Sequence, residues 1–405
     1  MFNQFNFDSK INKVLTDIGY KEPTPIQEQA IPKVLEGLDV IASAQTGTGK
    51  TAAFMLPLMH FLTSNEYRSD RGPQALILVP TRELAMQVAE EAKKFSKYLN
   101  KTKTVCIYGG MPYPQQRRAL SGPYEILVAT PGRLIDHLQQ GKVDLSRIKF
   151  LVLDEADRML DMGYIDDVDT IVKHTPATRQ TVLFSATIDN KILPVSKKLQ
   201  KNPFMIKVDP IQRRTGHIEQ KLYYVDGLTH KKQILEKLLE GPEIGPSIVF
   251  TSTIHQANDL AKHLYDKGYK TDALHGDLKQ NQRSRILNKL KTGNIQLLVA
   301  TDVAARGIDI STLTHVFNFD LPFVAEDFIH RIGRTGRAGA SGTAITFSTY
   351  QEDFRIKKIN QLLEKPIVAH ILEGLEPKPK GQFREKPSRR SQFGNRGRKP
   401  FSKRK

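Results

Sequence analysis

The sequence predicts an α/β protein of two successive domains, each a mostly parallel sheet with helices on both faces. Short apolar runs recur along the chain, and each precedes a helix-length amphipathic segment. Apolar runs without alternation are typical of strands that are buried on both faces of a parallel sheet. Two such series of similar length follow one another, and a single sheet that held all of these strands would be unusually wide.

The first series lies in residues 1–207 and the second in residues 218–370. The strands expected in the first are at residues 40–43, 75–79, 104–108, 126–129, 150–153 and 181–185. The strands expected in the second are at residues 220–225, 247–250, 272–274, 296–300, 316–319 and 344–347. Residues 208–217 show no clear periodicity and are predicted to be a linker, although an ordinary surface loop within one large sheet fits the same pattern.

Composition restricts the class of protein. The 61 Lys and Arg residues exceed the 43 Asp and Glu residues by 18, which favours a polyanionic partner, although a merely soluble basic protein also fits. Cys106 is the only cysteine, so an intrachain disulfide and a cysteine-based zinc site are excluded. The chain has neither a long apolar run nor a basic-then-apolar start, so we expect a cytoplasmic protein that does not enter a membrane.

Residues 371–405 are expected to form a disordered tail. From Leu375 to Lys405 the chain has twelve Lys or Arg residues against Glu376 and Glu385, a net charge of 12 − 2 = +10. A segment with so few aliphatic residues cannot bury enough apolar surface to fold alone. Phenylalanines are spaced among the basic residues, a pattern that suits stacking on bases, although a solvated tail without a function is the simpler interpretation.

A phosphate loop is predicted at residues 44–51, between a strand and a helix. Glycines there let backbone N–H groups turn toward phosphates at a helix N-terminus. Lys50 would pair with phosphate oxygens, and the Thr51 hydroxyl would bind Mg²⁺. Ala44 stands where the usual pattern has its first glycine. The residues expected around the nucleotide here are Ala44, Gln45, Thr46, Gly47, Thr48, Gly49, Lys50 and Thr51.

Two acids follow the predicted strand at residues 150–153. Asp154 stands at the carboxyl end of that strand, where ligands bind in open α/β sheets, and could hold Mg²⁺, partly through water. Glu155 could orient the attacking water and accept its proton. Acids at the start of a solvated helix also favour its dipole, but next to a phosphate loop they predict a site for ATP and Mg²⁺.

These motifs resemble those of the DEAD-box RNA helicases of superfamily 2, most nearly the RhlE-like bacterial branch. The resemblance spans roughly residues 2–370 and follows the family's order of motifs. It implies two tandem RecA-like domains and an ATP-dependent RNA helicase that converts ATP to ADP and phosphate. It also implies contact with a single RNA strand or short duplex, mainly through sugar and phosphate, with local unwinding or remodelling of ribonucleoprotein.

Residues 19–27 match the family's Q motif. The resemblance implies that Gln27 selects adenine, because an amide can donate to and accept from the edge of that base. Phe2 stands at the spacing of the family's upstream aromatic residue, which stacks on the base, and Tyr20 joins the nucleotide set. Alone, Gln27 would be an ordinary residue at a helix start.

Ser185, Ala186 and Thr187 match motif III of the family. By resemblance, Ser185 and Thr187 couple the ATP state to strand separation through contacts with Asp157. Alone, these residues would form a small-residue turn with a hydroxyl that caps the next helix.

Glycines, hydroxyls and arginines that follow predicted strands resemble the family's RNA-contacting set. Such groups at one edge of a sheet suit sugar–phosphate contacts, which position a strand without reading its sequence. Each alone would be an ordinary turn or helix cap. The resemblance assigns to RNA Pro80, Thr81, Arg82, Gly110, Thr130, Gly132 and Arg133 in the first domain, and Gly276, Gln280, Arg283 and Thr301 in the second.

Residues 330–337 match motif VI. Their three arginines stand at positions i, i+3 and i+6 around glycines, a pattern that core packing is not expected to explain. By resemblance, Arg334 and Arg337 are arginine fingers that stabilise charge on the transferring phosphoryl group. His330 would organise the attacking water with Glu155, and Asp309 would contact the ribose of ATP. A basic loop without a function is the alternative.

The predicted catalytic residues are divided between two domains, so hydrolysis is expected to require closure of one domain on the other. ATP and RNA would then favour the same closed state. A DNA helicase or translocase, and an ATP-gated RNA clamp without turnover, are the competing functions. No residue chooses between ribosome assembly and RNA decay or cold response, so ribosomal and RNA-decay proteins are both candidate partners, and a monomer is expected.

Overall fold

The structure is a computed structural model that describes residues 1–44, 48–64, 72–99, 102–208, 218–241, 244–305, 313–336, 341–363 and 365–379. The predicted linker, apart from Val208, lies outside these residues, as does the tail from residue 380 onward. Across these ranges, none of the helices is long and apolar enough to cross a membrane.

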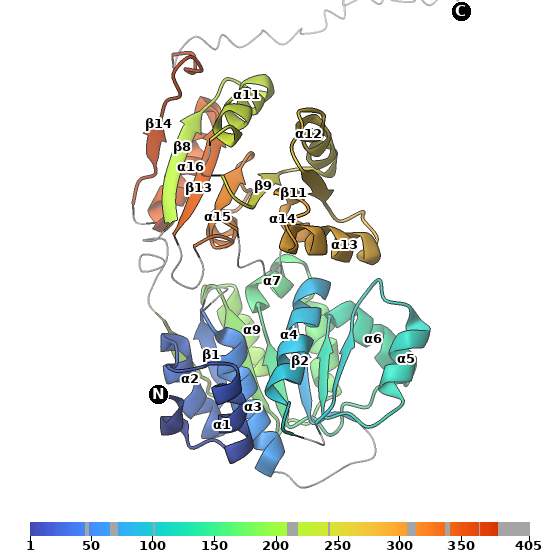
Figure 1. The fold of residues 1–405 in the computed structure, drawn as a ribbon. Helices are drawn as coiled ribbons and strands as arrows, with labels where there is room; N and C mark the ends of the chain where they lie inside the picture. The colour runs from blue at the N-terminus through green and yellow to red at the C-terminus, as the bar shows by residue number, and fades with distance from the viewer. Residues whose placement is uncertain are drawn as a thin grey trace, which may run out of the picture.

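The described strands form two sheets of seven, and every strand pair in them is parallel. We call the part up to Val208 the N-terminal unit and the part from Ile218 the C-terminal unit (Figure 1). The strands of the first are β1 (Val40–Ser43), β2 (Ala75–Leu78), β3 (Thr104–Ile107), β4 (Ile126–Ala129), β5 (Phe150–Leu153), β6 (Gln180–Ser185) and β7 (Phe204–Lys207). Those of the second are β8 (Ile218–Tyr224), β9 (Ser247–Thr251), β10 (Thr271–Leu274), β11 (Leu297–Thr301), β12 (His315–Asn318), β13 (Gly342–Ser348) and β14 (Val368–His370).

The two sheets have the same topology. The strand order is β3-β4-β2-β5-β6-β1-β7 in the first and β10-β11-β9-β12-β13-β8-β14 in the second, so each strand of one sheet has a counterpart at the same place in the other. This confirms the predicted fold class. The sequence pattern did not predict β7 and β14, two edge strands whose residues are mostly exposed. Their apolar runs, residues 204–206 and 367–369, are only three residues long.

Helices cover both faces of each sheet (Figure 1). Those of the N-terminal unit are the 3₁₀ helix η1 (Phe2–Phe5), α1 (Ser9–Asp17), α2 (Pro25–Leu35), α3 (Lys50–Ser64), α4 (Arg82–Phe95), α5 (Tyr113–Leu120), α6 (Pro131–Gln139), α7 (Ala156–Asp161), α8 (Ile165–Lys173) and α9 (Ile192–Leu199). Those of the C-terminal unit are α11 (Leu228–Leu239), α12 (Ile254–Asp266), α13 (Gln280–Lys291), α14 (Asp302–Ala305), α15 (Ala325–Ile332), η3 (Tyr350–Glu352) and α16 (Asp353–Leu363).

Each sheet separates two apolar cores, because successive side chains of a strand point to opposite faces. In β2, Ile77 belongs to the same core as Phe54 of α3, whereas the next residue, Leu78, belongs to the same core as Leu134 of α6. The C-terminal sheet is likewise packed on both faces. Because the central strands are covered on both faces and all strands are parallel, polar side chains gather in the loops at their ends, and these loops carry the predicted motifs.

The start of the predicted tail is ordered. Leu372 and Leu375 pack against the core of the C-terminal unit, and the backbone N–H of Lys378 donates to Asp226 Oδ1 at 2.9 Å. A ring nitrogen of His230 lies 3.0 Å from the Leu375 carbonyl oxygen. The expectation of disorder therefore fails for residues 371–379, because the few aliphatic residues of the segment lie in this part.

The thiol of Cys106 is protected by the fold. Its Sγ donates to the Ala85 carbonyl oxygen at 3.4 Å, and burial raises the pKa of the thiol to about 12. The thiolate is the reactive form, so at pH 8 we expect iodoacetamide to label the folded chain at least ~100-fold more slowly than the urea-unfolded chain. Mass spectrometry of single labelling over time measures this ratio. Equal rates would contradict the half-buried position of Cys106 and the raised pKa of its thiol.

Candidate nucleotide and RNA site

The phosphate loop follows β1 and leads into α3, as predicted. Lys50 is the first residue of α3, and Thr51 is the second. The Lys50 Nζ atom lies 3.7 Å from Asp154 Oδ1, and both side chains are buried. Thr48 is buried as well, and Ala44 donates its backbone N–H to the Ser185 carbonyl oxygen at 2.9 Å. Gln45, Thr46 and Gly47 lie outside the described residues.

Asp154 has the character expected of a ligand for a cation. It follows β5, and its Oδ1 is buried without a hydrogen-bond partner among the described residues. Burial raises the pKa of this carboxyl group to about 6, against the opposing effect of Lys50. The described residues contain no cluster of three or more His, Cys, Asp or Glu side chains around a common point. Mg²⁺ usually takes one or two protein carboxylates and completes its shell with phosphate oxygens and water, so the buried Asp154 carboxylate fits the chemistry of such a ligand.

Glu155 stands in a strained backbone conformation. Its φ and ψ are 57° and 52°, in the left-handed region, which for a residue with a side chain costs about 1–2 kcal/mol. The conformation is held because the Glu155 carbonyl oxygen accepts backbone N–H groups from Arg158 at 3.0 Å and Met159 at 3.1 Å at the start of α7. The turn therefore fixes the buried Glu155 beside the ion pair of Lys50 and Asp154.

The Q motif is joined to the phosphate loop. Gln27 is 1% exposed, and its Nε2 donates to the Gly49 carbonyl oxygen at 3.0 Å, while its Oε1 accepts from the Thr24 backbone N–H at 2.9 Å. The Thr24 hydroxyl donates to the Thr48 carbonyl oxygen at 2.7 Å. Gly49 is required here, because its φ is +87° and an added Cβ would lie 2.3 Å from Gln27 Nε2. One amide N–H and one oxygen lone pair of Gln27 are left over, as adenine recognition requires.

The aromatic residues of the nucleotide set pack together. Phe2 is 4% exposed, and its ring centroid lies 5.9 Å from that of Phe5 and 5.8 Å from that of Tyr20. Tyr20 in turn packs edge-on against Phe95 of α4. Phe2 is thus covered by other aromatic rings in this structure, and its predicted stacking on adenine stays a prediction.

The predicted coupling residues meet beside β6. Asp157 Oδ2 accepts the backbone N–H of Ala186 at 3.0 Å. Ser185 Oγ accepts the Thr187 backbone N–H at 3.3 Å, and the Ser43 hydroxyl of β1 donates to the Ala186 carbonyl oxygen at 3.0 Å. The small-residue turn thus connects α7 to the end of β1, the strand that leads into the phosphate loop.

Arg158, which the sequence did not single out, connects the two units. From α7 of the N-terminal unit, its guanidinium contacts Asp327 and the Nδ1 atom of His330, both on α15 of the C-terminal unit. Figure 1 shows α7 on the side of the N-terminal unit that faces the C-terminal unit. The Arg158 side chain is 6% exposed and that of Asp327 10%. His330 therefore lies at the boundary between the units, in contact with Arg158 and Asp327, and its predicted role with the attacking water stays a prediction.

Arg331 is a structural residue of the C-terminal unit. It is 2% exposed, and its Nε and Nη2 atoms form a double ion pair with the Asp302 carboxylate at 2.6 and 2.7 Å. Its Nη1 donates to the Asp320 carbonyl oxygen at 2.5 Å, and the guanidinium lies 4.9 Å from the Phe250 ring centre. The expectation that core packing explains none of the three motif arginines is therefore wrong for Arg331. The half-buried acid Asp302 and the adjacent carbonyl satisfy its charge.

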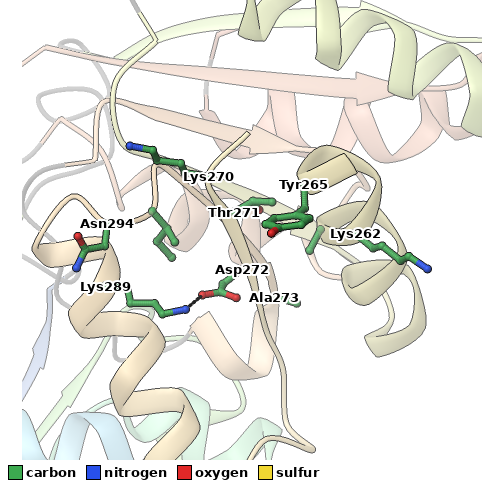
Figure 2. Close-up of a pocket in the computed structure, with 10 residues that line it drawn as sticks. Lys262, Tyr265, Lys270, Thr271, Asp272, Ala273, Lys289 and Asn294 are labelled. Atoms are coloured by element: carbon green, nitrogen blue, oxygen red, sulfur yellow. Dashed lines mark hydrogen bonds and ion pairs between the residues drawn. The ribbon is translucent and has the colours of Figure 1, made fainter. Parts of the chain in front are cut away.

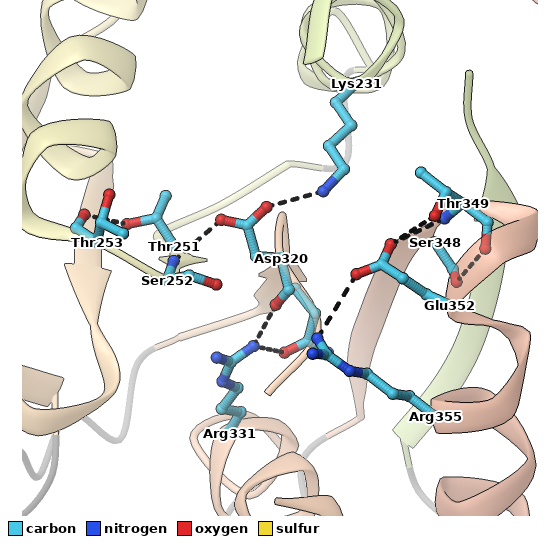
Figure 3. Close-up of polar contacts among 11 residues, drawn as sticks. Lys231, Thr251, Ser252, Thr253, Asp320, Arg331, Ser348, Thr349, Glu352 and Arg355 are labelled. Atoms are coloured by element: carbon cyan, nitrogen blue, oxygen red, sulfur yellow. Dashed lines mark hydrogen bonds and ion pairs between the residues drawn. The ribbon is translucent and has the colours of Figure 1, made fainter. Parts of the chain in front are cut away.

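Asp320 connects this arginine to its surroundings (Figure 3). Its side chain accepts from Lys231 Nζ of α11 at 2.8 Å and from the Ser252 backbone N–H, after β9, at 2.9 Å. Its carbonyl oxygen holds Arg331 on α15. The beginning of motif VI is thus tied to two other elements of the C-terminal unit, which fixes the direction in which α15 presents the residues that follow.

Arg334 comes one turn after Arg331 and is 6% exposed. It lines a small gap with Arg158, Asp327 and His330, at the boundary of the two units. An arginine at this place can reach a ligand shared by both units. Arg337 and Asp309, the other predicted contacts of ATP in the C-terminal unit, lie outside the described residues.

Most of the predicted RNA residues line one cavity of about 480 Å³ between the units. We call it the interdomain groove. The predicted residues that line it are Pro80, Thr81, Arg82, Thr130, Gly132, Arg133, Gly276 and Arg283. Glu83 and Gly109, which belong to the same motifs, line it as well. Asp136, Met162 and Tyr164 also line it, and the sequence did not single out these three for RNA. Thr301, the last residue of β11, is buried and is not among the lining residues.

Neighbouring residues fix the side-chain positions of two arginines that line the groove. Arg82 packs over Gly109 and Gly110, and an added Cβ on Gly110, whose φ is +88°, would lie 2.4 Å from Arg82 Nη1. Gly110 thus acts by making room for Arg82. Arg133 donates to the Met111 carbonyl oxygen at 2.8 Å, and its guanidinium lies 4.1 Å from the ring centre of Tyr113.

Arg283 is paired across the groove. Its Nη2 lies 2.9 Å from Glu83 Oε1 of α4, with both side chains less than 10% exposed. Gln280 Nε2 also donates to Glu83 at 3.5 Å. Burial lowers the pKa of the Arg283 guanidinium, and Glu83 opposes that shift. Arg283 Nε and Gln280 Oε1 are buried without hydrogen-bond partners among the described residues, so the groove keeps an unused donor and acceptor.

Comparison with protein families gives two matches that together span most of the chain. Residues 24–194 match the family model described as DEAD/DEAH box helicase, which includes the phosphate loop and residues 154–157. The chain belongs to the DEAD/DEAH box helicase family. In this DEAD-box chain, residues 230–339 match the model described as helicase conserved C-terminal domain, which includes α15 and Arg334.

Relatives of the DEAD-box chain are RNA helicases by name. It is 44% identical over 369 residues to ATP-dependent RNA helicase CshA of Listeria monocytogenes, covering 90% of this chain and 69% of that protein. It is 42% identical over 366 residues to ATP-dependent RNA helicase DeaD of Haemophilus influenzae, covering 90% of this chain but 59% of that protein. The DEAD-box assignment is thereby confirmed, whereas the RhlE-like branch stays a prediction.

Solved structures agree with the fold. S. cerevisiae Dbp5 bound to RNA and ADP BeF3 has a TM-score of 0.79 and 32% identity, covering 91% of this chain and 95% of that one. Mss116p bound to ssRNA and AMP-PNP has a TM-score of 0.82 and 29% identity, covering 90% of this chain and 78% of that one. These likenesses confirm the tandem RecA-like architecture and support ATP-dependent RNA helicase activity.

Proposed function

We propose that the chain is an RNA-stimulated ATPase that binds RNA by its backbone and separates short duplexes, or remodels ribonucleoprotein, when its two units close. The observation that carries the proposal is the division of both sites between the units. Lys50 and Asp154 belong to the N-terminal unit and Arg334 to the C-terminal unit, while the interdomain groove is lined from both. A ligand held by both units favours their closed arrangement, so ATP and RNA should each raise the affinity for the other.

The residues take distinct parts in hydrolysis. Lys50 pairs with phosphate oxygens, and Asp154 with Thr51 would hold Mg²⁺, which would supply positive charge to neutralise the phosphates. Glu155, fixed by its turn, orients the attacking water and accepts its proton. Arg334 stabilises the charge that develops on the phosphoryl group, and the contacts of Arg158 with α15 hold the units in register.

The proposal extends to the setting of the reaction. We place the domain boundary in residues 208–217, because the two family matches lie on either side of it. We infer a cytoplasmic monomer that acts on a single strand or short duplex. Sequencing the RNA that copurifies with the chain would distinguish ribosome assembly from RNA decay.

The test is a comparison of ATP turnover with and without RNA. We expect saturating poly(U) to raise the steady-state rate by at least ~10-fold, because closure completes a catalytic site that positioning and charge stabilisation govern. A DNA oligomer of the same length serves as the control and should stimulate less. Equal rates with and without RNA would refute the proposal, and equal stimulation by DNA would indicate a DNA-directed enzyme.

The basic tail should strengthen RNA binding. Residues 380–405 hold eleven Lys or Arg residues and one Glu. Truncation after Pro379, which keeps the ordered contact of Lys378, should lower RNA affinity by roughly tenfold and flatten its salt dependence by about 0.7 per lost phosphate contact. Fluorescence anisotropy at several salt concentrations measures both. A full-length chain with those eleven residues changed to Gln is the matched control and should behave like the truncation, and an unchanged slope would exclude contact of the tail with RNA.

A further inference from the structure

A second cavity, of about 400 Å³, lies outside the sites described so far. It is on the C-terminal unit beside β10, the edge strand of the second sheet, with α12 and α13 on its two sides (Figure 2). None of the residues that the family motifs single out lines it. We call it the β10 cavity.

The β10 cavity is basic. Lys262 of α12, Lys270 before β10 and Lys289 of α13 line it together with a single acid, Asp272. Lys289 pairs with Asp272 at 2.8 Å, whereas Lys262 and Lys270 have no acidic partner among the described residues. Two uncompensated positive charges from separate elements thus flank one cavity, which favours an anionic ligand.

An aromatic ring stands between these charges. Tyr265 of α12 is 70% exposed, and Figure 2 shows it between Lys270 and Lys262, above the pair of Lys289 and Asp272. Its ring stacks on no other aromatic ring in the described residues. The hydroxyl of Thr271, a residue 8% exposed that also lines the cavity, has no hydrogen-bond partner there. An exposed ring flanked by lysines is the arrangement that stacks a base and holds the phosphates on either side.

A short stretch of the chain links the β10 cavity to the interdomain groove. β10 runs from Thr271, in the cavity, to Leu274, and Gly276 two residues later lines the groove. At about 3.3 Å per strand residue, the cavity and the groove are roughly 17 Å apart. A single RNA strand that leaves the groove past Gly276 would therefore meet Tyr265 within a few nucleotides.

We propose that the β10 cavity binds the nucleotides of the RNA strand that lie beyond the interdomain groove, with a base stacked on Tyr265 and phosphates held by Lys262 and Lys270. The proposal rests on the RNA binding proposed above. An acidic peptide that adds a strand to the free edge of β10 would also satisfy the charge. RNA is favoured because the exposed ring offers a surface for a base and because Gly276, which lines the groove, follows β10 by two residues.

The experiment compares a short RNA with a longer one. A single strand of about 6 nucleotides fills the groove alone, whereas one of about 14 nucleotides also reaches the β10 cavity. With the full chain and AMP-PNP, we expect Tyr265→Ala to weaken binding of the long RNA by about fivefold and Tyr265→Phe, which keeps the ring, to bind like the unchanged chain. Lys270→Glu should also weaken it by about fivefold and lower the salt slope by at least ~0.7. The short RNA should bind all of these variants equally well.

Lys358→Glu is the matched control, because it makes the same charge change at an exposed position of α16. It should leave the affinity for both RNAs unchanged. Equal affinity of the long RNA for Tyr265→Ala and the unchanged chain would overturn the proposal, as would an equal loss for short and long RNA. Binding of polyglutamate that Lys270→Glu abolishes, with unchanged binding of the long RNA, would show a peptide site instead. Failure of the unchanged chain to bind either RNA would refute the proposed function itself.

Discussion

Arg334→Ala should reduce RNA-stimulated ATP turnover by about 10³–10⁵-fold, the range found when an arginine finger is removed. Arg334 belongs to the C-terminal unit and lies at the boundary, next to Arg158 and His330. It can therefore contribute charge stabilisation only when both units surround the nucleotide. Because Lys50 and the Q motif stay intact, binding of a fluorescent ATP analogue should change by less than about threefold.

Two further variants make this result specific. Arg334→Lys keeps the charge but loses the planar fork, so we expect it to recover only a small part of the rate. Arg355→Ala removes an arginine of α16 that pairs with Glu352 at 3.6 Å on the surface, and it should leave turnover unchanged. Thermal unfolding shows whether each variant is folded. Turnover within tenfold of the unchanged chain in a folded Arg334→Ala protein would contradict the assigned role.

Glu155→Gln should lower ATP turnover by about 10²–10⁴-fold, the usual contribution of a general base. Gln fills the same volume and leaves the turn at the start of α7 in place, so ATP and RNA should still bind. If the units close on ATP and RNA as proposed, they reopen only after hydrolysis. The variant should therefore hold RNA in a long-lived complex that requires ATP and does not form with ADP. Single-turnover hydrolysis and RNA dissociation rates measure the two effects.

Glu90→Gln is the control, because it makes the same change at an exposed position of α4. It should hydrolyse ATP and release RNA at the normal rates. If Glu155→Gln also turned over normally, another group would have to accept the proton from water, and the tightly bound complex would not appear.

The sequence predicted those elements of the fold whose residue pattern can be recognised within a few neighbouring positions. The central strands are apolar runs, and loops between strand and helix hold the phosphate site, so both follow from spacing alone. The edge strands β7 and β14 were missed because their apolar runs, residues 204–206 and 367–369, are only three residues long. Packing of Leu372 and Leu375 escaped because the basic composition of the following residues dominated the segment.

The sequence did not predict contacts between residues that are far apart along the chain. Arg331 and Arg334 look alike in the sequence, and only the position of Asp302 and Asp320 shows that Arg331 serves the interior of one unit. The partner of Arg283 could not be predicted either, since Glu83 is 200 positions away (283 − 83) and belongs to the other unit. Such pairings depend on how whole units face each other, which no local pattern encodes.

The pair of Glu83 and Arg283 has a consequence for how tightly the chain holds nucleic acid. A carboxylate already satisfies this guanidinium, so a phosphate that takes its place gains only the difference between two anions. The Glu83 carboxylate, which would lose its partner Arg283, would at the same moment be left as an unpaired negative charge. Such an exchange keeps the resting protein from retaining any stray polyanion and lets a strand leave easily once the units part. The internal anion thereby favours repeated cycles of capture and release over permanent attachment.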